Sequence, residues 1–314
     1  MDENHTQFDG FLLQGFSNLD DFRILLFSFF LCTFLLTLTG NMLVILAVYS
    51  HSRLHTPMYF FVTNLSLLEM WYIMTTAPKL LSLLLTKDDR ISHDWCFAQL
   101  YMFHGLGMTE CGLLAVMAFD RCMAICIPLR YTMIMNGRMC TFLAILCWAF
   151  GFMASLIPTI LTVNVSLCGP HYIDHYFCDL APLLALACTD TSFTKTINSS
   201  VIGFATMFNL IFIIFMYLNI IYSIMTLRTN TGRQKAFSTC SSHLTVVVLF
   251  YSTAFTVYAS PEGSWVTSHN KLFALVYTIF TPLLNPIIYS LRNNEVKIAL
   301  KGIIHRKCKH VRLS

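Results

Sequence analysis

Charged side chains are scarce in this 314-residue sequence. Asp, Glu, Lys and Arg together make up 11% of the residues, whereas 56% are hydrophobic. A soluble domain normally carries about 25% charged residues, so this chain has too few charges to cover a surface that faces water. Lipid is therefore the expected solvent. The net charge of +4 is also too small to suggest a nucleic-acid-binding protein.

Several functional motifs are missing as well. The sequence has no HExxH or GxSxG stretch and no pair of aspartates in the middle of an apolar run, which disfavours an intramembrane enzyme. Many secondary transporters contain internal repeats and a matching pair of spans broken by Gly or Pro. This sequence contains neither feature. An ion-coupled transporter or channel therefore remains only a weaker alternative to a receptor.

Long apolar runs divide the chain into seven stretches. A helix that crosses lipid needs about 20 mostly apolar residues, and helices are favoured because lipid cannot satisfy an exposed backbone group. A membrane β-barrel would instead show alternating segments of about 10 residues. The sequence therefore predicts an all-α membrane protein, with spans at residues 24–48, 58–85, 97–118, 140–163, 196–227, 236–259 and 272–291.

Seven crossings place the two ends of the chain on opposite sides of the membrane. With residues 1–23 outside, six of the 20 Lys and Arg residues fall outside and fourteen inside, as the positive-inside rule requires. We therefore expect an extracellular tail at 1–23, a seven-transmembrane helix bundle at 24–291 and a cytoplasmic segment at 292–314. That last segment has the spacing of an amphipathic helix on the inner leaflet, with a disordered basic tail as the alternative. Asn4 opens the sequon Asn4-His5-Thr6 and is the expected glycosylation site.

Four of the 12 cysteines fall on the expected outer side, where disulfides persist. Four cysteines allow three pairings, and the spacing alone cannot choose among them. The four are Cys96, Cys168, Cys178 and Cys188.

Two carboxyl groups fall at membrane depth. Glu69 and Glu110 each lie about 16 Å from the inner edge of their spans at 1.5 Å of rise per residue, and Asn41 and Asn285 lie in the inner halves of theirs. Two neighbouring carboxylates cannot both stay ionised cheaply, so one is protonated or a cation lies between them. The functional interpretation is a sodium or proton site that helps to switch the bundle. The alternative is a hydrogen-bond network that only packs the helices.

Five motifs recur in order along these spans. They are Gly40-Asn41, PMYFF at 57–61, MAFDRCMAICIPLRY at 117–131, KAFSTCSSH at 235–243 and PLLNPIIYSLRN at 282–293. Together they resemble the vertebrate odorant receptors, a branch of the rhodopsin-like G-protein-coupled receptors. The chain departs from the family at Cys122, where Tyr is usual.

The resemblance implies a receptor in the plasma membrane, in contact with lipid, that binds a small, mostly apolar volatile ligand outside. It also implies a heterotrimeric G protein of the stimulatory type as the inner partner and cyclic AMP as the signal. A receptor of the same fold for a non-odorant metabolite is the alternative. No cofactor is expected apart from the sodium ion. The pairing Cys96–Cys178 and Cys168–Cys188 is implied as well, together with switch residues at Asp120, Arg121, Tyr217, Lys235, His243, Asn285, Pro286 and Tyr289.

Within the switch, the acid of the Asp120-Arg121 pair is expected to hold the arginine at rest. The alternative is that Arg121 only extends its charged group to the membrane interface, without a role in switching.

The ligand pocket is expected between the outer halves of spans three, five, six and seven. His104 is the predicted polar contact, although any single residue there could equally be helix packing. Span seven has no internal lysine, which disfavours a retinal Schiff base. The outer half of span three has no carboxylate to meet an ammonium group, which disfavours a charged amine ligand. The predicted contacts are Phe103, His104, Gly107, Met108, Val201, Ile202, Ala205, Thr206, Tyr251, Phe255, Tyr258 and Thr278.

Overall fold

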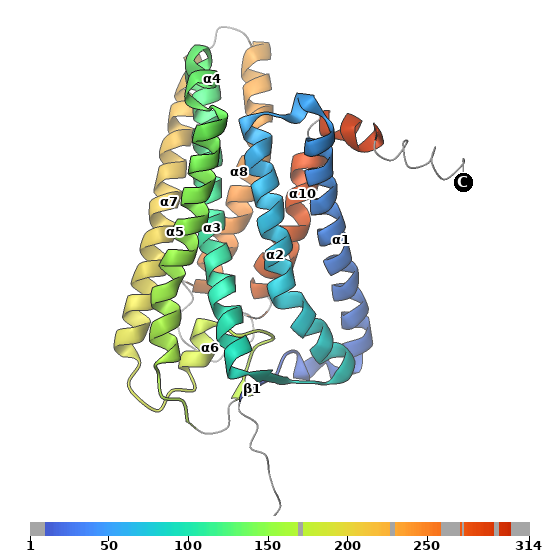
Figure 1. The fold of residues 1–314 in the computed structure, drawn as a ribbon, viewed down its shortest axis with the longest axis vertical. Coiled ribbons are helices and arrows are strands. Elements are labelled where there is room, and N and C mark those ends of the chain that lie inside the picture. Colours follow the sequence, from blue (N-terminus) through green and yellow to red (C-terminus); the bar gives the residue numbers. More distant parts are fainter. Residues whose placement is uncertain are drawn as a thin grey trace, which may run out of the picture.

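The computed structural model is a bundle of long helices with a small sheet at one end (Figure 1). It describes residues 10–168, 172–226, 230–258, 271, 273–291 and 295–302. Within these residues six long helices form the bundle with a seventh segment, in which a π-helical turn (η4, Val276–Phe280) leads into α10 (Thr281–Leu291). The six are α1 (Arg23–Ser50), α2 (Pro57–Thr86), α3 (His93–Cys126), α5 (Gly137–Val163), α7 (Ser192–Thr226) and α8 (Asn230–Tyr258).

Four of the described helical stretches are long and apolar enough to cross a membrane by length and composition alone. They are Leu19–Ser50, His93–Cys126, Gly137–Val163 and Ser192–Thr226. Their exposed faces carry large apolar side chains, such as Phe204, Phe208 and Phe215 on α7. Apolar faces of this extent suit lipid rather than water.

Most of the helices begin before the predicted spans, and at the starts of α3 and α5 a side-chain cap sets the boundary. The Ser92 hydroxyl accepts a hydrogen bond from the Trp95 amide at the start of α3. The largest difference concerns the polar stretch at 228–235, which the sequence predicts as the connection between spans five and six. Since α8 begins at Asn230, most of this stretch is helix, a state that polar residues also tolerate in contact with water.

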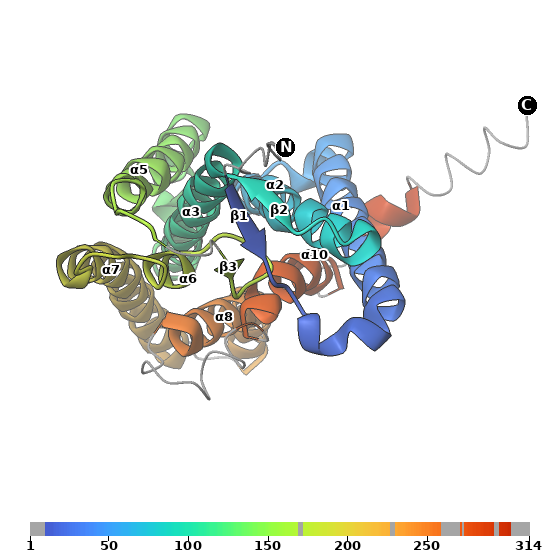
Figure 2. The ribbon, with the colours of Figure 1, turned by 90° about the horizontal axis from the view of Figure 1, so that it is seen from below.

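Helix α3 lies at the centre of the bundle, where it packs against α2, α5, α7 and α8 (Figure 2). Nearly every face of α3 is buried, whereas α1, α5 and α7 each leave one face exposed. The closest approach is to α5, where a Cβ atom added to Gly151 would lie 2.6 Å from the Thr109 amide nitrogen and 2.8 Å from the Gly105 carbonyl oxygen. Helix α3 therefore connects α2, α5, α7 and α8 by direct packing.

A three-stranded sheet covers one end of the bundle, which we call the sheet end (Figure 2). Strand β1 (Gly10–Leu13) pairs antiparallel with β2 (Arg90–Ser92) and parallel with β3 (Tyr172–Ile173). The sequence predicts only a polar tail at 1–23, so β1 is a correction: Phe11 and Leu13 are buried among the residues around the Cys96–Cys178 disulfide. A 3-10 helix at Ser17–Phe22 then leads into α1.

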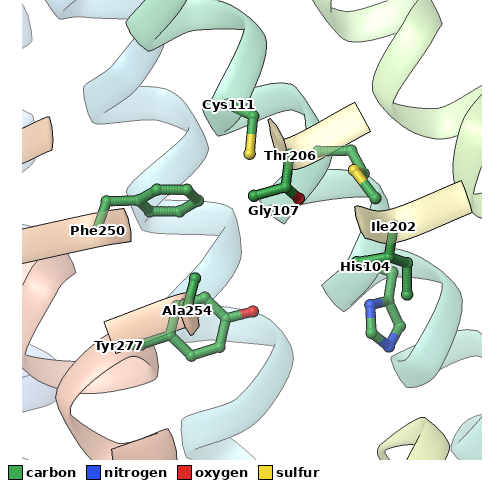
Figure 3. A pocket seen from close by; sticks show the side chains of 9 residues that line it. His104, Gly107, Cys111, Ile202, Thr206, Phe250, Ala254 and Tyr277 are labelled. Carbon is green, nitrogen blue, oxygen red and sulfur yellow. The ribbon is translucent and has the colours of Figure 1, made fainter. Parts of the chain in front are cut away.

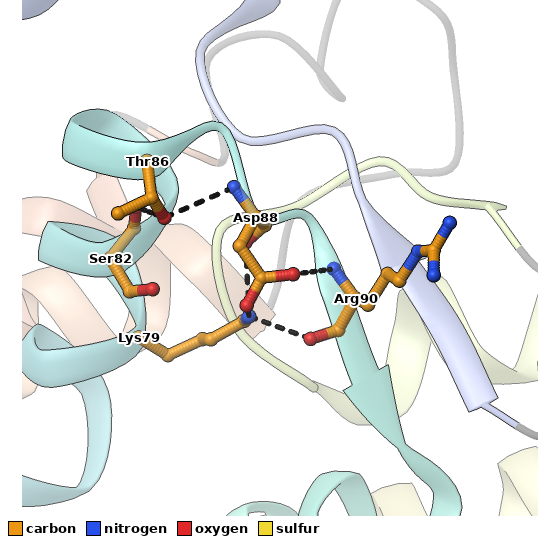
Figure 4. A network of polar contacts seen from close by, with 5 residues as sticks. All are labelled: Lys79, Ser82, Thr86, Asp88 and Arg90. Carbon is orange, nitrogen blue, oxygen red and sulfur yellow. Dashed lines mark hydrogen bonds and ion pairs between the residues drawn. The ribbon is translucent and has the colours of Figure 1, made fainter.

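Polar contacts hold the turn between α2 and β2 (Figure 4). The Lys79 ammonium donates to the Asp88 carboxylate at 3.2 Å and to the Arg90 carbonyl oxygen at 2.6 Å. The Asp88 carboxylate in turn accepts from the Arg90 amide at 3.3 Å. The hydrogen bond from Lys79 is the main reason that the pKa of Asp88 lies below its usual value. A second ion pair joins Lys87 to Asp20 at 3.0 Å and ties this turn to the segment before α1.

The opposite end of the bundle, which we call the tail end, carries the short connecting elements and the last described residues. These are 3-10 helices at Ser52–Leu54 and Pro128–Arg130, and α4 (Tyr131–Ile134). Residues 295–302 are helical, with Val296 and Ala299 buried and Glu295 3.8 Å from Arg53. These residues coincide with part of the amphipathic helix predicted for 292–314, while the glycosylation candidate Asn4 lies outside the described residues.

Candidate functional site

A cavity lies among α3, α7, α8 and η4 (Figure 3). Helix α3 supplies side chains at three- and four-residue spacing, which places them on one face of the helix. The lining residues are His104, Gly107, Met108, Cys111, Ile202, Thr206, Phe250, Ala254 and Tyr277. The wall is thus mostly apolar with a few hydrogen-bonding groups, the usual chemistry of a small-molecule site.

Five of the predicted contacts line this cavity. They are His104, Gly107, Met108, Ile202 and Thr206. The structure adds Cys111, one turn further along the same face of α3, together with Phe250, Ala254 and Tyr277. The α3 periodicity could have found Cys111, because it continues the spacing of 104, 107 and 108.

The predicted face of α8 is wrong at Phe255. This side chain is 70% exposed, whereas the cavity is lined by Phe250 and Ala254, which are four residues apart on another face. Tyr251 is buried and close enough to Cys111 to interact with it electrostatically. The side chain of Tyr258 lies outside the described residues.

The remaining predicted contacts pack near the cavity without lining it. Phe103 is buried against Tyr72, Phe177 and Tyr277, with ring centroids 5.2, 4.5 and 5.4 Å away. The Thr278 hydroxyl lies 2.9 Å from the Tyr176 hydroxyl, so it links the last helix to the loop over the cavity. Val201 and Ala205 belong to α7 but are absent from the cavity lining.

Both disulfides implied by the resemblance are present, Cys96–Cys178 and Cys168–Cys188. The first joins the start of α3 to the segment before α6 (Leu180–Leu184). The next residue, Asp179, is thereby held beside the cavity.

His104 pairs with Asp179, which the sequence does not predict. The imidazole Nε2 lies 3.2 Å from the Asp179 carboxylate, and both side chains are buried. The carboxylate also accepts a hydrogen bond from the Leu180 amide at 2.8 Å. Burial alone would raise the pKa of Asp179, but the hydrogen bond from His104 and the other contacts outweigh burial and hold it below its usual value. The outer half of span three has no carboxylate of its own, but the loop supplies Asp179 at this point, a contact not expected from the sequence.

The four polar residues predicted at membrane depth are all buried. The Asn285 amide donates to the Glu69 carboxyl group, and Glu110 is close enough to Glu69 to interact electrostatically. Asn41 donates to the Pro282 carbonyl oxygen at 3.2 Å. One oxygen of each residue has no hydrogen-bond partner within the described part of the chain. These oxygens are Oδ1 of both asparagines, Oε2 of Glu69 and Oε1 of Glu110. Unsatisfied oxygens in a buried site fit a bound cation or a shared proton.

At the tail end, Asp120 and Arg121 are buried but bonded to different residues. The Tyr131 hydroxyl donates to Asp120 at 2.8 Å, whereas the Arg121 guanidinium contacts the Met58 sulfur. Among the described residues no ion pair joins Asp120 to Arg121. Asp120 is thus hydrogen-bonded to Tyr131, the first residue of α4, and the expected role of its charge in holding Arg121 at rest stays a prediction.

His243 connects three helices. Its Nδ1 lies 2.7 Å from the Tyr217 hydroxyl of α7, and its Nε2 lies 3.1 Å from the Leu114 carbonyl oxygen of α3. Tyr289 is buried, and its hydroxyl has no hydrogen-bond partner among the residues that the structure describes. Pro286 packs against α1, where a Cβ atom on Gly40 would lie 3.3 Å from its ring. The side chain of Lys235 lies outside the described residues.

Comparisons with known proteins agree with this arrangement. The sequence model of the olfactory receptor family matches residues 30–307. Olfactory receptor 6Y1 of Homo sapiens is 46% identical over 303 residues, covering 96% of this chain and 93% of that protein. Olfactory receptor 1M1 of Mus musculus is 45% identical, with 97% of each chain covered, and olfactory receptor 226 of Rattus norvegicus is 44% identical, with 96% and 94% covered. Matches of this extent show that the chain belongs to the olfactory receptor family, whose members are multi-pass membrane receptors rather than enzymes.

Proposed function

We propose that this receptor binds a small, mostly apolar odorant in the cavity and activates a stimulatory G protein at the tail end, which raises cyclic AMP. The observation that carries the proposal is that α3 and α8 contribute both to the cavity wall and to the contact between His243 and Leu114. A ligand that changes the spacing of the two helices at the cavity therefore acts on that contact.

The transmitting path is short. Phe250 lies seven residues from His243 on α8, which is about 10 Å along a helix axis. A ligand that wedges between Phe250 on α8 and Met108 on α3 tilts α8 away from α3. This motion separates His243 from Leu114 and Tyr217, and it opens the tail end to the G protein. The ligand supplies the driving free energy only through its preference for the tilted arrangement.

The ligand should carry a hydrogen-bonding group. The His104–Asp179 pair and the hydroxyls of Thr206 and Tyr277 are polar groups that the cavity region offers. An oxygenated odorant is therefore favoured over a pure hydrocarbon, since burying these groups against an apolar molecule costs free energy.

A cyclic-AMP assay against an odorant panel tests the proposal. Ala254→Phe, which fills the cavity, and His104→Ala, which removes its polar contact, should both shift or abolish the responses. Phe255→Ala is the matched control, because that side chain is exposed on the same helix. Unchanged responses in both cavity variants, or a loss confined to the control, would show that the ligand binds elsewhere.

We further propose that a sodium ion is held among Glu69, Glu110, Asn41 and Asn285 and biases the switch. The four unpartnered oxygens support this assignment, since hard cations prefer oxygen ligands. Replacing sodium by an organic cation should change basal cyclic AMP in the wild type but not in Glu110→Gln. The same response to sodium in both proteins would favour a packing network.

We also propose that the receptor lies in the plasma membrane with its sheet end outside. The excess of Lys and Arg on the tail-end side supports this orientation. An epitope at the N-terminus should be accessible on intact cells, and Asn4→Gln should remove a glycan from the mature protein. Antibody access only to the C-terminus would reverse the topology.

A further inference from the structure

Three thiols gather at the tail end, where α3, α7 and α8 meet. On α3 the sulfur atoms of Cys122 and Cys126 lie 3.7 Å apart. Cys240 on α8 is buried and close enough to interact electrostatically with both. The Ser223 hydroxyl of α7 lies 3.1 Å from the Cys126 sulfur. Cys122 stands where the resemblance to the odorant receptors leads us to expect tyrosine.

The geometry of Cys122 and Cys126 is unsuited to a disulfide. Residues four apart on a helix have Cβ atoms about 5–6 Å apart, whereas a disulfide needs about 3.5–4.5 Å. Closing the bond would therefore require distortion of α3. The physiological compartment expected at this end, the cytosol, also keeps thiols reduced.

The same geometry suits a metal ion that both sulfurs contact. With a metal–sulfur bond of about 2.3 Å, two sulfurs 3.7 Å apart subtend an angle of about 107° at the ion. That angle is close to the tetrahedral one that Zn²⁺ prefers. A spacing of four residues on a helix is also the spacing of the two zinc-binding histidines in HExxH.

We propose that Cys122 and Cys126 form a binding site for a soft metal ion of the Zn²⁺ class, completed by Cys240. Each thiol gives up a proton, two sulfur–metal bonds form, and the protons pass to solvent. Within the described residues no group of three His, Cys, Asp or Glu side chains is already arranged to hold an ion, so Cys240 must approach to become the third ligand. Thiolate ligands select Zn²⁺ and Cu⁺ over Mg²⁺ and Ca²⁺.

Metal binding should oppose activation of the G protein by the receptor. This step rests on the proposed function. Cys240 lies three residues before His243 on α8, and Cys122 lies on α3. An ion shared between them holds the two helices together where activation separates them. The coupling between the two sites is reciprocal. If the metal weakens binding of the activating ligand by some factor, the ligand weakens binding of the metal by the same factor, commonly about 5-fold or more.

Metal binding by the purified full-length receptor tests the site. Cd²⁺ serves as the probe, because thiolate-to-metal charge transfer gives it an ultraviolet absorption, and Cys308→Ser is the background that removes the tail thiol. Cys122→Ser and Cys126→Ser should bind about 10- to 100-fold more weakly, and so should Cys122→Tyr, which carries the usual family residue. Cys147→Ser, a buried thiol of α5, should bind like the background. Equal affinity in all variants would overturn the site.

Nucleotide exchange on the G protein tests the consequence. In washed membranes, buffered Zn²⁺ should lower ligand-stimulated exchange by the background receptor, and a chelator should restore it. Exchange by Cys122→Tyr should be insensitive to Zn²⁺. Metal binding without any effect on exchange would overturn the clamp between α3 and α8, whereas exchange that no ligand stimulates even with chelator present would overturn the proposed function instead.

Discussion

The buried pair His104 and Asp179 gives the most direct prediction for a single residue. Asp179→Asn keeps the shape of the side chain but removes the charge that faces the imidazole, so it should lower the free energy of unfolding by about 1.5–3 kcal/mol. Melting of the purified receptor measures this change. Asp21→Asn, an exposed acid at the same end of the molecule, is the control. Equal melting temperatures for the two variants would mean that the pair contributes nothing to stability.

His175 predicts how the sheet end responds to acid. Burial is the main reason that its pKa falls from 6.5 to about 4, and Lys271 adds to this effect while Asp174 and Asp179 oppose it. The unfolded chain therefore binds a proton first as the pH falls, and stability should decrease between about pH 6.5 and pH 4, by about 3 kcal/mol in total. Asp179 does not contribute to the pH dependence of stability in this range. A carboxyl group with a lowered pKa loses its stabilising effect only when the pH falls below the usual carboxyl pKa.

Melting temperature against pH checks the sign. The wild type should lose stability steadily from pH 7 to pH 5, and His175→Phe, which cannot be protonated, should lose less. A His175→Phe slope as steep as that of the wild type would assign the acid sensitivity to other groups.

At the scale of single elements, glycines decide how closely α3 and α5 approach. A Cβ atom on Gly151 would lie 2.8 Å or less from Thr109 and the Gly105 carbonyl oxygen, whereas one on Gly203 of α7 would meet nothing within 4 Å. Gly151→Ala should therefore destabilise the receptor by about 1–3 kcal/mol, while Gly203→Ala should stabilise it slightly because alanine favours a helix. Melting temperatures of the two variants should move in opposite directions. A harmless Gly151→Ala would mean that the helices can separate at this point without cost.

The helices themselves could be predicted from the sequence, because apolar runs of this length have few alternatives in lipid. The rotation of α8 could not. Phe250, Tyr251 and Phe255 are all apolar or aromatic, and both lipid and the bundle interior accept such residues, so periodicity cannot distinguish the cavity face from the lipid face. The short strand β1 was equally inaccessible, since its partners lie about 80 and 160 residues away and each pairing is only two or three residues long.

Over the whole molecule, the cavity and the tail end share two helices. His104, Met108 and Leu114 lie on one of them, and Ala254, Phe250 and His243 lie on the other. Under the proposed function, ligand binding and opening of the tail end are therefore expected to be a single relative movement. Interiors packed this closely shift as units rather than deforming gradually. The resemblance of sequence motifs predicts the switch residues, but only the structure shows that Asp120 is bonded to Tyr131.

The distance between the tail ends of α3 and α8 tests this account most directly. Spin labels at Leu129, which follows α3, and Phe237 on α8, both exposed, report it by pulsed electron paramagnetic resonance in a background without other accessible cysteines. An odorant that is active in the cyclic-AMP assay should lengthen the distance, and Ala254→Phe should abolish the change. An unchanged distance with an activating odorant bound would contradict the proposed movement of α8.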